Sequence, residues 1–519
     1  MEQTEDQSAA LEFLARRDSY DPAPETEPLH VATHGSHVFL VGDRAYKLKR
    51  AVAFPYMDYG TLERRKCFTE AELELNRRTA PDLYLGIRRL TRTEDGGLAF
   101  DGAGETIEYV LEMRRFAEET LLDRMAESGT LTPALIERTA ERIRAFHDSA
   151  KSLSPNQAPG AGSAGVRTVL EENFEEFEAQ PEHFPPGEVA AYARDVWSAF
   201  ERVAPLLDSR VAGGQAKHCH GDLHLRNICL LDGEPTLFDG IEFNPLFACI
   251  DVLYDLAYFL SDLIIRGRAD LANLAFNRYF VDGDYEGLAC LPLFISTRSA
   301  VRAKIMVSAA EVQDDPSARA EMLTQSRLSF AAAAEQIAEM SPRLIGIGGF
   351  SGSGKSTLAR ALAARLRPAP GALHLRSDII RKHLFGYTPT TPLPPEAYSP
   401  KISARVYALM LERAEAALKA GYPAIMDAVN DRPIDRDAME TLAVSLGVRF
   451  DGFWLDLPPE VMAKRIARRQ EDASDATECV MLEQVAHGHG PLESWAEIDA
   501  SGSPDSALEA VFALLPACY

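Results

Sequence analysis

The pattern of hydrophobic and polar positions changes once along the chain, near residue 341. Beyond this point, short apolar runs alternate with longer helical stretches; the runs lie at 343–350, 372–376, 422–427, 449–457 and 496–500. Strands that alternate with helices predict a parallel sheet covered by helices on both faces. We therefore expect a mostly parallel five-stranded sheet in this part of the chain.

The pattern before residue 341 is different. Two apolar runs within 38–49 flank the turn formers Gly42 and Asp43, which predicts a hairpin, and 107–116 is typical of a buried strand. Helical stretches follow up to about residue 340, so we expect a small β-rich lobe and then a helical lobe. The predicted fold class is a multidomain combination of α+β and α/β, divided into an acidic extension and two domains at 1–27, 28–340 and 341–519.

Composition narrows the functional classes. A chain of 519 residues is too long for one ordinary core. Its net charge of −24 argues against a general nucleic-acid binder, which needs a basic surface. There is no apolar run of membrane-spanning length, and the seven cysteines are scattered without a CxxC pair. We expect a cytoplasmic protein with reduced thiols and no membrane association, and its charge disfavours a nucleic-acid partner.

A complete phosphate-binding loop follows the first strand of the second part. Residues 349–356 match G-x-x-x-x-G-K-[ST] between a predicted strand and a predicted helix. The loop backbone would cradle the phosphates of ATP, Lys355 would reach the β- and γ-phosphates, and the Ser356 hydroxyl would hold Mg²⁺. The expected nucleotide contacts are Gly349, Ser351, Gly352, Ser353, Gly354, Lys355, Ser356 and Thr357.

Polar residues at the ends of the next strands suggest the rest of a kinase site. Asp378 follows the second strand, where a carboxylate is placed to deprotonate an acceptor hydroxyl. The alternative is that Asp378 only caps the helix that begins at Ile379. Arg381 is a candidate clamp for a phosphate, and Asp427, at the end of the third strand, is a candidate Mg²⁺ ligand.

A basic helix end after the fourth strand is typical of a lid. Arg465, Arg468 and Arg469 precede a polar loop, and together they are expected to close over ATP and to stabilise transition-state charge. A merely solvated basic face is the alternative for any one of these arginines.

A second and different phosphotransfer motif lies in the first part. HCHGDLHLRN at 218–227 places Asp222 as a base and Asn227 five residues on as a metal ligand, and Asp239 ends the following strand as a second metal ligand. A zinc cluster of His218, Cys219, His220 and His224 is one alternative, and a loop merely braced by its aspartates is another.

These motifs resemble two known kinase families. GFSGSGKST, RSDIIRKHL, AIMDA and ARRQEDASDA, within 344–517, are similar to the P-loop kinases grouped with zeta toxins, gluconate kinase and the 5′-kinase of polynucleotide repair. In that family the aspartate after strand two is the general base, and the arginine three residues on contacts acceptor or phosphate. The resemblance therefore assigns these roles to Asp378 and Arg381.

HGDLHLRN, FDGIEFN and IDVLYDLAY, within 28–330, resemble the aminoglycoside phosphotransferase and choline-kinase-like family. This resemblance implies that Lys47 anchors ATP, with Lys49 as the fallback, and that Glu70 is its partner, with Glu74 one turn on. The phosphate loop departs from the family pattern, because only Gly35 precedes the lysine strand. The pairing of the two halves resembles a bacterial family of two-domain proteins.

The leading hypothesis is an ATP- and Mg²⁺-dependent bifunctional kinase that phosphorylates hydroxyl groups of small molecules. One alternative is an ATP-binding regulatory protein whose N-terminal half is a pseudokinase that recruits a protein partner. The other is a polynucleotide 5′-hydroxyl kinase. The sequence does not identify the acceptor.

Overall fold

The N-terminal part is built on an antiparallel sheet. The computed structural model describes residues 5–54, 56–338, 341–469 and 472–515. Six strands pair in the order β1-β2-β3-β8-β6-β7: β1 (Leu29–Ala32), β2 (Ser36–Val41), β3 (Arg44–Lys49), β6 (Tyr84–Arg92), β7 (Leu98–Phe100) and β8 (Thr106–Arg114). The predicted hairpin within 38–49 is confirmed, because β2 and β3 pair antiparallel with Val41 opposite Arg44.

Helices frame this sheet and follow it. Helix α2 (Leu62–Asn76) follows the hairpin, and α1 (Ser8–Leu14) precedes the sheet. The later helices are α3 (Leu122–Glu127), α4 (Pro133–Ser149), α5 (Gly162–Ala179), α6 (Pro186–Ala212), α7 (Pro245–Ala248), α8 (Val252–Ile265), α9 (Ala269–Tyr279), α10 (Leu291–Glu311) and α11 (Pro316–Ile337). Short strands interrupt them: β4 (Ala53–Phe54) with β5 (Met57–Asp58), β9 (Ala216–His218) with β12 (Cys249–Asp251), and β10 (Ile228–Leu231) with β11 (Glu234–Leu237).

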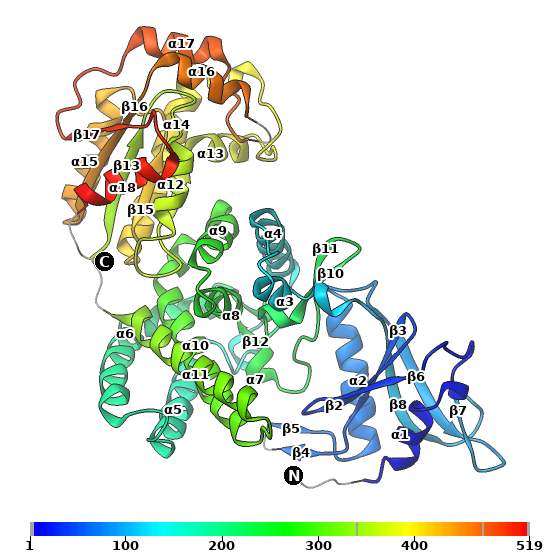
Figure 1. Ribbon diagram of the computed structural model, residues 1–519. Helices are drawn as coiled ribbons and strands as arrows, with labels where there is room; N and C mark the ends of the chain where they lie inside the picture. The colour runs from blue at the N-terminus through cyan, green and yellow to red at the C-terminus, as the bar shows by residue number, and fades with distance from the viewer. Residues whose placement is uncertain (1–4, 55, 339–340, 470–471, 516–519) are drawn as a thin grey trace. The chain divides into compact units, whose positions relative to one another are not determined.

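The C-terminal part holds a five-stranded sheet in which every strand is parallel to its neighbours. The order is β14-β15-β13-β16-β17, with β13 (Arg343–Gly348), β14 (Leu373–Arg376), β15 (Ala424–Asp427), β16 (Arg449–Asp456) and β17 (Trp495–Asp499). The helices between and after these strands are α12 (Lys355–Ala363), α13 (Ser377–Leu384), α14 (Pro400–Lys419), α15 (Pro433–Leu446), α16 (Pro459–Ala467), α17 (Glu478–His487) and α18 (Pro504–Leu514) (Figure 1).

Alternation along β13 explains why both faces of this sheet are buried. Ile345 and Ile347 belong to a core that includes Leu358 of α12 and Leu508 of α18. The intervening Gly346 faces the opposite way, where an added Cβ would meet the ring of Trp495 at 2.6 Å and the sulfur of Met439 at 3.4 Å. Successive strand residues point to opposite faces, so each face receives its own layer of helices.

The fold class is therefore mixed α/β, as predicted, with an antiparallel sheet in the N-terminal half and a parallel sheet in the C-terminal half. The described chain divides into two compact units: the first runs to Leu170 and includes Leu207–Phe259, and the second contains Glu171–Leu206 and the chain from Leu260 onward. The three-part domain division stays a prediction. In the part of the chain that the structure describes, no helix is both long enough and apolar enough to cross a membrane.

We predict that Phe453→Ala destabilises the parallel sheet by about 3 to 5 kcal/mol, because truncating a buried aromatic removes its packing and leaves a cavity. Phe453 is 2% exposed and belongs to the core against α12 and α18. Denaturant unfolding measures this loss. Val444→Ala, at an 80% exposed position of α15, is the control and should change stability by about 0.5 kcal/mol or less. Equal losses in the two variants would contradict this account of the core.

Candidate functional site

The loop from Gly349 to Gly354 leaves the carboxyl end of β13 and enters α12 at Lys355. Its three glycines have positive φ angles of 144°, 85° and 95° at Gly349, Gly352 and Gly354. At Gly349 an added Cβ would also lie 2.7 Å from the Ser353 hydroxyl oxygen. Side chains are strained in this backbone conformation, so the glycines allow the loop to curl around a phosphate chain.

A cavity of about 410 Å³ lies at this loop. It is lined by loop and helix residues 351–358, by Arg376 at the end of β14, by Asp378 in the first turn of α13, and by Arg465, Arg468 and Arg469. The structure thus brings together most residues that the sequence predicted for this site. Its lining does not include three of the predicted residues: Gly349, Arg381 and Asp427.

Lys355 and Asp378 lie in an environment that disfavours both of their charges. Burial lowers the pKa of Lys355, although the charges of Asp427 and Asp378 act in the opposite direction. Burial also raises the pKa of Asp378, against the effect of Arg376 and Lys355. A carboxylate with a raised pKa is a better proton acceptor, which suits the role expected of Asp378.

Arg376 also lies at this site, although no sequence motif predicted it. Its Nη2 lies 2.6 Å from the Asp472 carboxylate and 4.0 Å from that of Asp378, and its Nε lies 4.0 Å from that of Asp427. One guanidinium therefore faces three carboxylates at the edge of the cavity. Its place as the last residue of β14, two positions before Asp378, was the signal available in the sequence.

Asp427 is buried at the end of β15 and has one oxygen already engaged. Its Oδ2 lies 3.0 Å from His374 Nε2. Burial acts to raise the pKa of Asp427, but the hydrogen bond from His374 and the charges of His374, Arg376 and Lys355 outweigh it and lower the pKa to about 2. Asp427 is therefore a carboxylate at neutral pH.

Three buried polar atoms at this site have no hydrogen-bond partner among the described residues: Asp427 Oδ1, the Ser353 hydroxyl and Arg376 Nε. Buried polar groups are nearly always paired, so such atoms need a ligand, an ion or water. A carboxylate oxygen suits Mg²⁺, and a hydroxyl in a glycine loop suits a phosphate. The residues present therefore fit ATP with Mg²⁺.

The other predicted arginines have different surroundings. Arg381 donates to the Ala397 carbonyl at 2.7 Å and lies 5.0 Å from the Tyr398 ring, so its contact with an acceptor stays a prediction. Arg465 donates to the carbonyls of Ser353 and Ala500 at 3.0 and 2.8 Å. Arg465 thus braces the phosphate loop through its backbone. The roles of Arg468 and Arg469 as charge stabilisers stay predictions.

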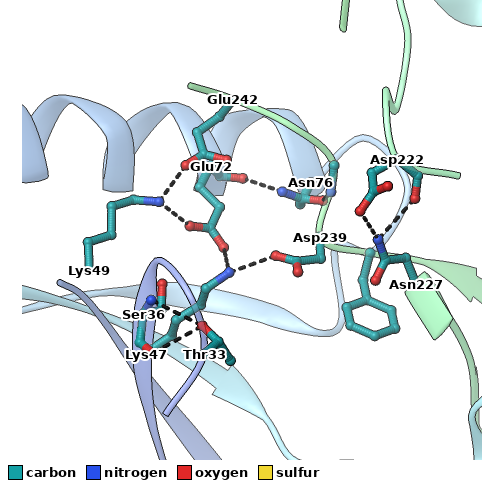
Figure 2. Close-up of polar contacts among 12 residues, drawn as sticks. Thr33, Ser36, Lys47, Lys49, Glu72, Asn76, Asp222, Asn227, Asp239 and Glu242 are labelled. Atoms are coloured by element: carbon teal, nitrogen blue, oxygen red, sulfur yellow. Dashed lines mark hydrogen bonds and ion pairs between the residues drawn. The ribbon is translucent and has the colours of Figure 1, made fainter. Parts of the chain in front are cut away.

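The second predicted site surrounds the loop between β9 and β10. Asn227 donates to the Asp222 carboxylate at 2.9 Å, so the predicted base and metal ligand are neighbours (Figure 2). The buried carboxylate of Asp255 receives the backbone N–H groups of His220 and Gly221 at 3.1 and 2.8 Å. These bonds hold the loop that carries Asp222.

Lys47 on β3 is paired, but not with the glutamate predicted. Its Nζ lies 2.7 Å from Glu72 and 2.6 Å from Asp239, whereas Glu70 lies 4.0 Å from Lys66. The expectation that Glu70 is the partner of Lys47 is therefore wrong. Two residues along a helix turn the side chain by about 200°, so Glu72 faces β3 while Glu70 faces solvent.

Glu72 also binds the second lysine of the same strand. Its other oxygen lies 2.7 Å from Lys49 Nζ, as expected for lysines two residues apart on one face of a strand. Lys49 further contacts Glu242 at 2.5 Å, and the Tyr59 hydroxyl donates to Glu242 at 2.7 Å. Figure 2 shows Glu72 between the two lysines. Neither Glu72 nor Glu242 was predicted.

The turn between β1 and β2 is tightly closed, at the place where the family resemblance puts a phosphate-binding loop. Thr33 and Ser36 close it through three hydrogen bonds of 2.8 to 3.0 Å. An added Cβ at Gly35 would meet the Met57 side chain at 3.1 Å. The backbone is thus bonded to itself here, and this turn offers much less to a phosphate than the loop at 349–354.

The zinc alternative is not supported by the arrangement of its four residues. Among described residues, the group able to hold a metal is His147, Cys219 and Asp255, which contains one of the four. His220 Nε2 instead bonds the Phe238 carbonyl at 2.8 Å, and His224 lies 3.3 Å from Asp222.

Comparisons with known proteins match both halves. The model of the phosphotransferase enzyme family matches residues 89–291, and that of the AAA domain matches residues 344–491. An uncharacterized protein of Mycobacterium tuberculosis and another of Mycobacterium bovis are each 30% identical over 451 residues, which cover 86% of this chain and 87% of theirs. A thymidylate kinase of a Synechococcus species is 29% identical and covers 33% of this chain and 94% of its own.

Similar solved structures include a choline/ethanolamine kinase family protein from Mesorhizobium loti, with 13% identity and a TM-score of 0.37, covering 63% of this chain and 99% of its own. A gluconokinase from Sinorhizobium meliloti has 21% identity and a TM-score of 0.25; the match covers 34% of this chain and 92% of the gluconokinase. The chain belongs to the same family as the two mycobacterial proteins. Its two halves are a phosphotransferase-family domain and a P-loop kinase-type domain, so it is of the phosphotransferase class.

We predict that Glu72→Gln lowers the free energy of unfolding by about 3 to 5 kcal/mol, because it leaves the buried Lys49 and the half-buried Lys47 without their shared carboxylate. Glu72 is 1% exposed, and Lys49 is 3% exposed. Glu70→Gln, on the exposed face of the same helix, is the matched control and should stay within about 0.5 kcal/mol of the parent chain. Thermal or denaturant unfolding distinguishes the two variants.

The same pair of variants tests the pH dependence. Burial acts to raise the pKa of Glu72, but Lys47 and Lys49 outweigh it and lower the pKa from 4.5 to about 2. The stability that this carboxylate contributes is complete above pH 4.5 and is lost as the pH falls toward 2. Glu72→Gln should therefore flatten the fall of stability over this pH range, and an unchanged slope would contradict the pairing.

Proposed function

We propose that the C-terminal half is an ATP-dependent kinase that transfers the γ-phosphoryl group to a hydroxyl group of a small molecule. The observation that carries this proposal is the single cavity that joins the glycine loop, Lys355, Asp378 and the arginines of the lid. A nucleotide-binding loop alone would also suit an ATPase or a sensor. The half-buried carboxylate of Asp378 in the same cavity would supply the base that transfer to a hydroxyl requires.

Each residue has a distinct part in this reaction. The loop N–H groups and the positive end of α12 bind the ATP phosphates. Asp378 orients the acceptor hydroxyl and takes its proton as the oxygen attacks the γ-phosphorus. Lys355, with Arg468 and Arg469, balances the charge that develops on the transferred group. Mg²⁺, when held by Ser356 and Asp427, supplies further neutralisation of the phosphates.

We propose a second transfer site in the N-terminal half. Asp222 would act as the base, Asn227 and Asp239 would hold Mg²⁺, and Lys47 would bind the ATP phosphates. The ion pair of Lys47 with Asp239 is consistent with this assignment, since both side chains face the same space. Under this proposal the chain is a bifunctional kinase.

A regulatory role for the N-terminal half is the second candidate, because its turn at Thr33–Ser36 is closed by its own hydrogen bonds. In that case the half binds a protein partner and the C-terminal site alone transfers phosphate. For both candidates we propose small-molecule acceptors in the cytoplasm rather than nucleic acid, in keeping with the net charge of −24.

We predict that Lys355→Ala and Asp378→Asn lower phosphate transfer by the C-terminal site about 10²- to 10⁴-fold, since each removes charge stabilisation or the base. The assay incubates the chain with γ-labelled ATP and a metabolite extract and resolves the labelled products. Asp499→Asn is the control, because this exposed aspartate ends the neighbouring strand β17 and does not line the cavity.

Asp222→Ala in the same assay separates the two candidates for the N-terminal half. Loss of a product that Lys355→Ala retains would support two kinases. An unchanged product profile would contradict the bifunctional proposal and favour regulation. Full activity of Asp378→Asn would contradict the proposed mechanism of the C-terminal site.

A further inference from the structure

The strand β14 lies at the edge of the parallel sheet, and a helix rather than a strand covers its outer side. The helix is α9, and two of its asparagines bond the strand backbone. Asn273 and Asn277 donate to the Ala372 carbonyl at 3.0 and 3.2 Å, and Asn277 accepts the His374 N–H at 2.7 Å. Exposed edge strands present unpaired backbone groups, and these side chains satisfy them here.

Apolar packing supports the same contact. Phe276, between the two asparagines on α9, lies against Tyr422 with ring centroids 5.5 Å apart, and both residues are fully buried. Asn273 is 2% exposed. Helix α9 belongs to the segment matched by the phosphotransferase family, whereas β14 belongs to the segment matched by the AAA domain. Both lie in one compact unit of the chain.

His374 connects this contact to the nucleotide site. Its backbone is held by Asn277, and its imidazole bonds Asp427 Oδ2 at 3.0 Å. The second oxygen of Asp427 is buried and has no hydrogen-bond partner among the described residues. One oxygen of the carboxylate is thus fixed from the side of α9, and the other is left for a ligand.

We propose that Asn277 and His374 are positioning residues that aim Asp427 at the metal of the C-terminal nucleotide site, so that helix α9 of the phosphotransferase-family half is a working part of the P-loop kinase. This inference rests on the proposed function and adds to it the residues that hold Asp427 in position. Groups that orient a metal ligand act through hydrogen bonds to its outer side, and their loss lowers metal affinity about 10- to 100-fold.

Both residues suit this task physically. The His374 N–H is held within a packed interface, and a buried donor that loses its acceptor shifts its backbone or bears the cost of desolvation. Movement of His374 would turn the imidazole away from Asp427. The carboxylate would then keep its charge but lose its fixed direction, so metal binding would weaken while the phosphate loop remained intact.

The test compares binding of a non-hydrolysable ATP analogue with and without Mg²⁺, by calorimetry on the full chain. The parent chain and all variants carry Asp239→Asn, which removes the charged one of the two metal ligands proposed for the other half. His374→Gln keeps an amide N–H near the position of Nε2, whereas His374→Asn is too short to reach Asp427. Asn277→Ala removes the acceptor of the His374 N–H, and Asn273→Ala is its control, since Asn277 still bonds the strand.

We expect Asn277→Ala and His374→Asn to lose about 10- to 100-fold of the affinity gained from Mg²⁺, with metal-free binding within about twofold of the parent. His374→Gln and Asn273→Ala should keep the gain. A full gain in Asn277→Ala and His374→Asn would overturn this inference alone. Loss of metal-free binding as well would also overturn it, because these residues would then support the loop rather than Asp427. No gain in the parent chain would overturn the proposed metal site and this inference with it.

Discussion

The parallel pairing of β13, β15 and β14 is the constraint on which the C-terminal site depends. Parallel strands end at the same edge of a sheet, and here three adjacent strands deliver the glycine loop, Asp427, Arg376 and Asp378 to one edge. Burial at this edge disfavours the charges of Lys355 and Asp378, and the opposite charges around them compensate only in part. Bound phosphates and a bound cation would compensate the remaining charge of these side chains. The site therefore suits a charged ligand better than an apolar one.

The N-terminal site depends on a cluster of ion pairs between charged side chains. A single buried carboxylate, Glu72, bridges two lysines of one strand, and Lys47 reaches on to Asp239 beyond it. This cluster fixes a cation and a candidate metal ligand close to each other without help from the turn at Thr33–Ser36. Under the proposal of two transfer sites, the C-terminal half would bind phosphate through backbone amides and the N-terminal half through charged side chains.

The strands and the glycine loop could be predicted because they depend on local signals: apolar runs, turn formers and a motif of fixed spacing. The Lys47 partner could not, because a helix with glutamates at 70, 72 and 74 gives no apolar periodicity that fixes which of them faces the sheet. Arg376 was missed for a related reason. Its importance comes from Asp427 and Asp472, which are far away in sequence and are brought to it by the fold. The hydrogen bond from the His374 N–H to the Asn277 side chain joins segments 97 residues apart and has no sequence signal.

The most direct test of the central claim is a crystal structure of the chain with Mg²⁺ and a non-hydrolysable ATP analogue. Our account predicts the triphosphate in the loop at 349–354, with Lys355 Nζ in hydrogen-bonding distance of the γ-phosphate. It also predicts the Asp378 carboxylate facing that phosphate across a space wide enough for an acceptor hydroxyl. A nucleotide bound away from this loop, or a γ-phosphate turned away from Asp378, would contradict the claim that this half is a kinase.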